Sequence, residues 1–235
     1  MQVRPQNLVY DRSRKYYVAT DQFDPWLLSG KTSELLAVLG QVQTDESPLL
    51  ALTARAPAVA MVNPLERELD LMTFRAISQA ASNGLRVSLS YQSMNQPEPM
   101  ALILSPHTLV YSGFRWHVRA FSDSHDEYRD FVLARIRSPV KVLDVAGVSA
   151  AHDEAWHREL PVTITPHPQL PPAQQKVIAD DYGMTDGAIT VSVRQALLGY
   201  FLKLMQIEPQ REHPEAKVQQ IVLANKAALA SYLWS

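Results

Sequence analysis

The sequence contains no cysteine, and this absence excludes several classes of protein at once. Without thiols there is no disulfide framework, no thiolate nucleophile and no zinc site with cysteine ligands. Long apolar runs are missing too, since the longest stretches, such as residues 100–104, are far too short to cross a bilayer as a helix. Residues 1–18 lack the apolar segment of a secretory signal. We therefore expect a soluble, cytoplasmic protein.

Neither sign of charge is in excess, because the 235 residues carry a formal net charge of −2 at pH 7. Any basic surface for nucleic acid must therefore be local. The standard catalytic motifs GxSxG, GxGxxG and HExxH and the Walker loop are absent. His152 and His157 are five residues apart, on different faces of a helix, so metal binding there is not favoured. We expect no enzyme activity, no metal and no cofactor.

The N-terminal residues 8–18 predict a small β-hairpin with a basic tip, formed by Arg12, Arg14 and Lys15. A hairpin needs other elements to pack on, and none precedes it, so the chain looks as if it starts in the middle of a domain. Apolar spacing then predicts helices at 33–42 and 65–81 with a strand at 56–62 between them. Asn83-Gly84 ends the second helix.

Alternation of apolar and polar residues dominates the middle of the chain, at residues 85–145. It predicts strands at 85–91, 100–104, 109–111, 114–121, 128–136 and 140–145, separated by turn residues such as Ser105-Pro106. Short strands at such close spacing favour a small barrel or a strongly curved sheet.

The last part of the chain, residues 149–235, has the size of a small α+β domain. A short helix is expected within 147–159, then strands at 160–165, 188–194 and 218–223 and helices at 173–182, 195–205 and 225–233. Two apolar clusters are each either domain core or dimer interface. One comprises Leu197, Leu198, Phe201, Leu202 and Met205, and the other Leu229, Tyr232, Leu233 and Trp234.

The most informative segment is residues 113–121, whose side chains alternate between two faces if it is a strand. The side chains expected in the core are Phe114, Trp116, Val118 and Ala120. The opposite face carries Arg115, His117 and Arg119 in steps of about 7 Å. Arginine forks suit phosphates and planar nucleobases, and histidine adds stacking and a second donor. The alternative is a solvated face with ordinary ion pairs.

The next strand pattern places four more side chains on one face, namely Arg129, Phe131, Leu133 and Arg135. A phenylalanine between arginines suits a platform on which bases stack. It suits equally an apolar pair inside the barrel, with arginine heads that reach water. Tyr91 and Ser93 at the end of the first strand, and His107 at a strand start, either add polar groups to a pocket or are merely structural.

These residues resemble a known family. The segment around Trp116-His117-Val118 is similar to the strand with the Trp-Tyr-Leu tripeptide that names WYL domains, and the spacing of Ser105-Pro106-His107, Gly113 and Arg129-x-Phe131-x-x-x-Arg135 agrees over residues 85–145. Residues 7–12, 90–93 and 113–119 narrow the resemblance to regulators of the BrxR and CapW type, which are encoded beside phage-defence operons of the BREX and CBASS systems.

The resemblance implies an α+β protein with a winged helix-turn-helix, a WYL domain with an Sm-like, SH3-type β-barrel, and a WCX-like α+β C-terminal extension that dimerises. Residues 1–28 would be a remnant wing hairpin, 29–82 a helical linker, 83–148 the WYL domain and 149–235 the C-terminal domain. The implied function is a homodimeric repressor of a phage-defence operon. Its WYL domain would sense a nucleic-acid or nucleotide ligand and couple that ligand to operator DNA binding.

Carried over by motif, the ligand pocket comprises Tyr91, Ser93, His107, Arg115, His117, Arg119, Arg129 and Arg135, and the stacking interpretation adds Phe131. The wing tip, with Arg12, Arg14 and Lys15, would contact DNA phosphates. Two features depart from the family pattern: its tyrosine is His117 here, and the recognition helix expected before the wing is absent. The alternative function is a single-stranded nucleic-acid-binding module without regulatory coupling.

Overall fold

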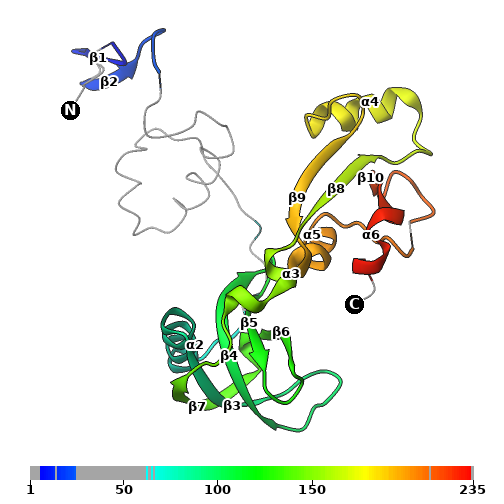
Figure 1. Ribbon diagram of the computed structural model, residues 1–235. Helices are drawn as coiled ribbons and strands as arrows, with labels where there is room; N and C mark the ends of the chain where they lie inside the picture. The colour runs from blue at the N-terminus through cyan, green and yellow to red at the C-terminus, as the bar shows by residue number, and fades with distance from the viewer. Residues whose placement is uncertain are drawn as a thin grey trace. The chain divides into compact units, whose positions relative to one another are not determined.

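The computed structural model of the protein describes residues 6–13, 15–24, 62, 65, 67–211 and 213–233. The chain divides into two compact units, Met1–Leu65 and Glu66–Ser235. The described part of the first unit is the predicted hairpin, in which β1 (Leu8–Asp11) pairs antiparallel with β2 (Tyr16–Ala19) (Figure 1). The helix expected at 33–42, and the strand expected at 56–62 except for its last residue, lie outside the described residues.

The second unit begins with helix α2 (Leu71–Asn83), later than the predicted start at residue 65. The side chain of Asp70 caps the helix by accepting a hydrogen bond of 2.7 Å from the backbone N–H of Thr73. Gly84 ends it in the left-handed conformation with φ 62° and donates its N–H to the carbonyl of Ala80. The buried Ile77 and Ala80 belong to the same core as the strands that follow.

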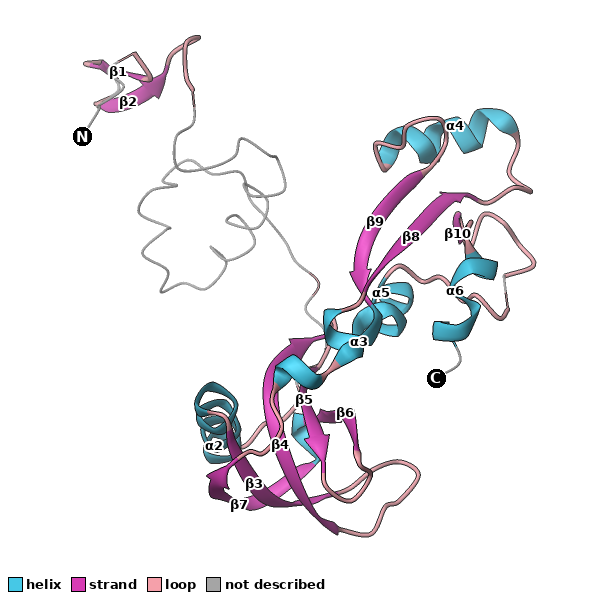
Figure 2. Ribbon diagram, in the orientation of Figure 1, coloured by secondary structure: helices cyan, strands magenta, loops and turns pink. Residues whose placement is uncertain are grey.

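A five-stranded antiparallel sheet follows, with the strand order β6-β5-β4-β3-β7 (Figure 2). Its strands are β3 (Leu85–Tyr91), β4 (Met100–Tyr111), β5 (Trp116–Ser122), β6 (Glu127–Val132) and β7 (Ile136–Val145). Helix α2 packs on β3, β4 and β7. One short 3₁₀ helix, η2 (Leu133–Arg135), joins β6 to β7.

Two details of this sheet differ from the prediction. The turn expected at Ser105-Pro106 is instead the middle of β4, where the register against β5 shifts between Pro106 and Thr108. Such a bulge accommodates a proline, which has no N–H for the ladder. The strand expected at 128–136 ends at Val132 because η2 interrupts it, so the alternation does not extend from Phe131 to Arg135.

The C-terminal domain has a three-stranded antiparallel sheet with the order β10-β8-β9, so the whole fold is α+β as predicted. Two short helices, η3 (Ala150–His152) and α3 (Glu154–His157), lead into it. Its elements are β8 (Glu159–Pro166), α4 (Pro172–Asp181), β9 (Ile189–Arg194), η4 (Gln195–Leu197), α5 (Leu198–Leu204), β10 (Ile221–Leu223) and α6 (Lys226–Leu233). None of the described helices is long and apolar enough to cross a membrane.

The apolar side chains of α5 and α6 form the core of the C-terminal domain. Leu198 and Leu202 of α5 and Leu229 of α6 are buried in one cluster with the inner residues of the sheet. Tyr232 and Leu233 pack against the same cluster, whereas Trp234 lies outside the described residues. Of the two interpretations of these clusters, the structure therefore supports domain core.

Candidate functional site

Strand β5 is buried on both of its faces. Val118 and Ala120 lie in the core of the five-stranded sheet, as predicted. On the other face His117 and Arg119 are only 1% and 6% exposed, so this face is covered by other parts of the chain and is not a solvated surface.

The prediction that Trp116 belongs to the core is wrong, because Trp116 is 46% exposed. It pairs with Tyr111 at the last position of the β4–β5 ladder, where the sheet ends. The rings of Trp116 and Tyr111 lie 5.0 Å apart, so they cover one another. Phe114, also expected in the core, precedes the strand and is half-buried.

Arg119 is held by two carboxylates. Its Nε and Nη2 donate to Asp153 Oδ2 and Oδ1 at 2.5 and 2.9 Å, which is a bidentate fork. Its Nη1 donates to Asp130 Oδ1 at 3.2 Å, and Asp130 lies directly opposite Arg119 on β6. Asp153 also caps α3 by accepting from the N–H of Trp156. Arg119 therefore ties the sheet to the helix that leads into the C-terminal domain.

His107 and Tyr200 complete this group. His107 is the extra residue of the β4 bulge, and its Nε2 lies 3.2 Å from Asp153 Oδ2. The hydroxyl of Tyr200, on α5, donates to Asp130 Oδ2 at 3.1 Å. We call Arg119, Asp130, Asp153, His107 and Tyr200 the polar cluster. It joins side chains of β4, β5 and β6 to the N-cap of α3 and to α5.

The ionisable groups of the polar cluster have shifted pKa values around the single guanidinium of Arg119. Burial opposes ionisation of Asp153, but the hydrogen bonds and charge of Arg119 outweigh it and lower the pKa of that carboxyl. Burial raises the pKa of Asp130 despite its contact with Arg119. Burial also lowers the pKa of His107, against the opposing effect of Asp153. At neutral pH Asp153 is therefore ionised and His107 is neutral.

His117 lies beside the polar cluster in a different environment. Its Nε2 accepts a hydrogen bond of 3.1 Å from Arg115 Nε, and its ring lies 4.8 Å from the ring of Tyr200. Burial, and next the charge of Arg115, lower the pKa of His117 to about 4, so the ring is neutral at pH 7. Since Nε2 accepts, the proton is assigned to Nδ1.

Three arginines act on His117. Arg115 donates a hydrogen bond to its ring, and the charges of Arg115, Arg135 and Arg67 all lower the pKa of His117. None of the three forms an ion pair with a carboxylate in the part of the chain that the structure describes. We call Arg67, Arg115 and Arg135 with His117 the basic surface. Its charge is available to an anion.

The other pocket residues predicted from the sequence lie apart from the basic surface or in the core. Phe131 is 4% exposed and packs edge-on against Tyr91 at 5.2 Å, so its ring lies in the apolar core. The hydroxyl of Tyr91 accepts from the N–H of Val132. Ser93 Oγ accepts from the N–H of Gln96 in a loop, and the exposed Arg129 pairs with Glu127.

The residues of the polar cluster that sequence reasoning missed are Asp130, Asp153 and Tyr200, and in the basic surface it missed Arg67. Asp130 sits in the sequence between the two side chains that were singled out, Arg129 and Phe131, and only the β5–β6 register reveals that it faces Arg119. Asp153 and Tyr200 are 34 and 70 residues from their partners in the chain. No local pattern could have found these two.

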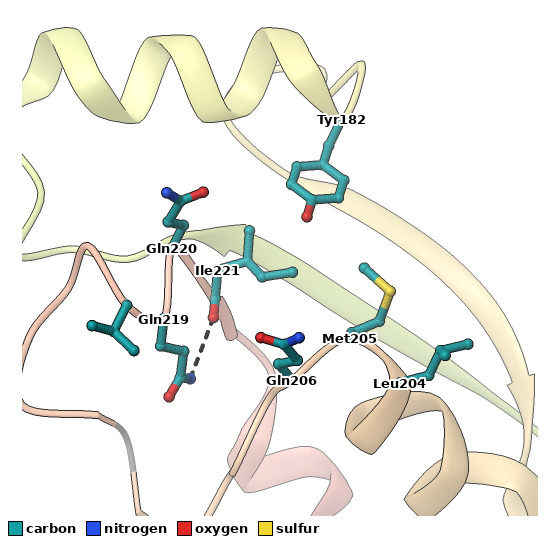
Figure 3. A pocket seen from close by; sticks show the side chains of 8 residues that line it. Tyr182, Leu204, Met205, Gln206, Gln219, Gln220 and Ile221 are labelled. Atoms are coloured by element: carbon teal, nitrogen blue, oxygen red, sulfur yellow. Dashed lines mark hydrogen bonds between the residues drawn. The ribbon is translucent and has the colours of Figure 1, made fainter. Parts of the chain in front are cut away.

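Two further features complete the inventory of candidate sites. At the hairpin tip Arg12 and Lys15 are exposed, whereas Arg14 lies outside the described residues. A cavity of about 330 Å³ opens in the C-terminal domain, between the ends of α4 and α5 and the segment before β10 (Figure 3). Its lining is uncharged and comprises Tyr182, Leu204, Met205, Gln206, Val218, Gln219, Gln220 and Ile221. Among the described residues no group of three or more potential ligands is placed to hold a metal ion.

Three family models match successive parts of the chain. They are the BrxR transcriptional regulator winged helix-turn-helix domain at residues 1–41, the WYL domain at 72–141, and the BrxR transcriptional regulator C-terminal dimerization domain at 159–229. A protein from Stenotrophomonas maltophilia named DNA-binding transcriptional repressor CapW is 31% identical over 99% of this chain and 78% of its own length. The chain belongs to the BrxR/CapW family of WYL-domain regulators.

Other members of the BrxR/CapW family are equally similar. The proteins of that name from Escherichia coli and Pseudomonas aeruginosa are each 34% identical, over 97% and 94% of this chain and 77% and 74% of their own lengths. A solved structure of proteasome accessory factor B/C from Arthrobacter aurescens is 19% identical with a TM-score of 0.32. The match covers 71% of this chain but only 27% of that protein. The resemblance inferred from the WYL motif is thus confirmed.

Replacement of Arg119 by methionine should destabilise the protein strongly. The variant keeps most of the side-chain volume but leaves Asp153 and Asp130 buried without their cation, which costs about 3–5 kcal/mol. The matched control is Arg129→Met, which removes an exposed ion pair worth less than about 1 kcal/mol. Urea unfolding followed by tryptophan fluorescence measures both. Equal losses in the two variants would show that the polar cluster contributes no more than a surface pair.

His117 should make the protein less stable as the pH falls below neutrality. An unfolded histidine takes up a proton near pH 6.5, while folded His117 does so only near pH 4. Between these values the unfolded state binds more protons, so stability decreases on acidification, by up to about 3 kcal/mol. In His117→Gln the melting temperature should therefore fall less between pH 7 and pH 5 than in the wild type. The exposed control His213→Gln should keep the wild-type dependence, and identical profiles for all three proteins would contradict the assignment.

Proposed function

We propose that this protein is a DNA-binding transcriptional repressor that acts as a homodimer and senses a phosphate-bearing ligand through its WYL domain. One observation carries the proposal: winged-helix, WYL and dimerization models match the chain in this order, and the CapW repressors are similar to it over nearly its whole length. A twofold dimer would present two DNA-binding domains to a palindromic operator.

The hairpin β1–β2 supports the DNA-binding part of this proposal. Its tip is narrow and carries the exposed side chains of Arg12 and Lys15, with Lys15 in the left-handed conformation at φ 56°. A hairpin tip of this kind fits the wing of a winged helix, where cations contact DNA phosphates and fix the position of the protein on the duplex. Arg14 stays a predicted member of the same group.

The WYL sheet supports the sensing part. Helix α2, five antiparallel strands and a 3₁₀ turn between the two outer strands fit an Sm-like, SH3-type barrel. The basic surface comprises Arg115, which donates to the neutral His117, and Arg67 and Arg135, whose charges also lower the pKa of that histidine. Guanidinium groups bind phosphates with paired hydrogen bonds, so a nucleotide or a short nucleic acid is the ligand that this surface favours.

Regulation requires that the ligand prefer one of two states of the dimer. A ligand that binds both states equally does not change the equilibrium between them. The polar cluster offers a physical route, because it connects the strand beside the basic surface to α3 and α5. Control of a phage-defence operon is part of the proposal and rests on membership of the BrxR/CapW family. A single-strand-binding module without coupling to DNA is the alternative function.

The wing can be tested by charge removal. In Arg12→Gln/Lys15→Gln, two phosphate contacts are lost, so affinity for the DNA upstream of the protein's own gene should fall. The slope of log affinity against log salt should become shallower by about 2. The control Lys176→Gln/Lys226→Gln removes two charges from α4 and α6 and should leave both quantities unchanged. Fluorescence anisotropy of the labelled fragment measures them, and equal slopes in the two double variants would remove the hairpin from the DNA interface.

Ligand sensing can be tested on the same complex. Short single-stranded oligonucleotides, or nucleoside triphosphates, should release the labelled upstream DNA from the wild-type protein. Arg115→Gln/Arg135→Gln should still bind that DNA but resist release, because the phosphate contacts of the basic surface are lost. Oligonucleotides that bind the wild type without releasing DNA would favour the uncoupled module instead. If the protein does not distinguish the upstream fragment from unrelated DNA, the repressor proposal fails.

A further inference from the structure

The C-terminal domain contributes directly to the surroundings of the basic surface. We infer that α5 completes the ligand site of the WYL domain and that Lys203 on α5 binds the ligand's phosphate together with Arg115. The inference rests on the proposed function, because it adds a residue to the ligand site proposed there. In this arrangement the ligand site contains residues of both the WYL domain and the C-terminal domain.

Helix α5 lies along the turn between β4 and β5 at three positions. The ring of Tyr200 faces His117 at 4.8 Å, and Lys203 Nζ lies 5.8 Å from the centre of the Phe114 ring. Leu204 closes over Gly113, where a Cβ atom would lie 2.6 Å from Leu204 Cδ1. These three α5 residues fall within one helical turn, so one face of α5 meets residues 113–117. Figure 2 shows α5 between the two sheets.

Arg115 and Lys203 lie on the same aromatic ring from different domains. Arg115 Cζ is also 5.8 Å from the centre of the Phe114 ring. A cation over an exposed aromatic ring gains only about 0.5–1 kcal/mol, and the ring does not neutralise its charge. Neither cation pairs with a carboxylate of the described residues. Two like charges held near one ring, beside Arg135 and Arg67, create a local positive potential that a bound polyanion would relieve.

The surroundings of a second lysine show that this arrangement is specific. Lys176 on α4, in the same domain, donates to Asp180 at 2.7 Å one helical turn away. Lys203 has no such neighbour on α5, whose sequence is Leu-Gly-Tyr-Phe-Leu-Lys-Leu. In the described part of the chain the ammonium group of Lys203 forms no ion pair, and its aromatic contact is with Phe114, across the domain boundary.

A phosphate at this place would act on the dimerization domain through a short path. Lys203 is next in sequence to Leu202, which is buried with Leu198 in the core of that domain. Tyr200, on the same helix, donates to Asp130 of the polar cluster. A ligand that contacts α5 therefore acts on a helix with residues in both the polar cluster and the C-terminal core. Tyr200 is a positioning residue in this arrangement, and Lys203 is the residue that touches the ligand.

The test compares single-charge variants of the full-length chain. The probes are a fluorescent, 5′-phosphorylated single-stranded hexanucleotide, measured by anisotropy, and ATP as its competitor. In Lys203→Gln the affinity for the hexanucleotide should fall about 5–10-fold and the salt slope should decrease by about 1. Lys203→Arg should restore most of the affinity, and Lys176→Gln should stay within about twofold of the wild type. Competition by ATP at comparable concentration would identify a mononucleotide site, and weak competition an oligonucleotide site.

Two results would overturn the inference. One leaves the proposed ligand site of the WYL domain intact, and the other overturns the proposed ligand as well. If Arg115→Gln abolishes binding while Lys203→Gln matches Lys176→Gln, the WYL ligand site stands and α5 is not part of it. If the wild-type chain binds neither probe at low salt, the proposed phosphate ligand falls as well. Circular dichroism and the oligomeric state, both expected to be unchanged in Lys203→Gln, separate lost binding from lost folding.

Discussion

The bidentate pair between Arg119 and Asp153 is the interaction on which the arrangement of the WYL and C-terminal domains depends. Both side chains are nearly inaccessible to water, so removal of either leaves the other charge buried and unpaired. Arg119 comes from the middle of β5, and Asp153 caps the helix that leads into β8. A strand of the WYL sheet and the start of the C-terminal domain are therefore joined by a buried ion pair.

The second carboxylate of the polar cluster, Asp130, explains why α5 contributes a residue to that cluster. One guanidinium faces two acids, and burial raises the pKa of Asp130 although it also contacts Arg119. The hydroxyl of Tyr200 supplies Asp130 with an additional donor at 3.1 Å, and burial raises the pKa of Tyr200 itself, so the hydroxyl stays protonated. Because Tyr200 also faces His117, the same helix contacts both the polar cluster and the basic surface.

Strands and helix ends, which depend on neighbouring residues, could be predicted from the sequence. Side-chain pairs between residues far apart in the chain could not. Alternation located β3 within residues 85–91 and the core position of Val118, and Gly84 ended α2 as expected. The same alternation failed for Trp116, because the sheet ends there and leaves the ring half-exposed beside Tyr111. It also failed for residues 133–135, where a 3₁₀ turn replaces the strand. Asp153 could not be predicted as the partner of Arg119, since 34 residues separate them.

Arg115 and Arg119 are two residues apart and looked equivalent in the sequence, but their hydrogen bonds give them different roles. Arg119 uses Nε and both terminal nitrogens for carboxylates, so a ligand would have to displace a buried ion pair to reach it. Arg115 uses only Nε, for a neutral histidine, and its terminal nitrogens have no hydrogen-bond partner among the described residues. That neutral acceptor orients the guanidinium without cancelling its charge. Of the two arginines, Arg115 is therefore suited to bind a phosphate and Arg119 to transmit the effect of binding.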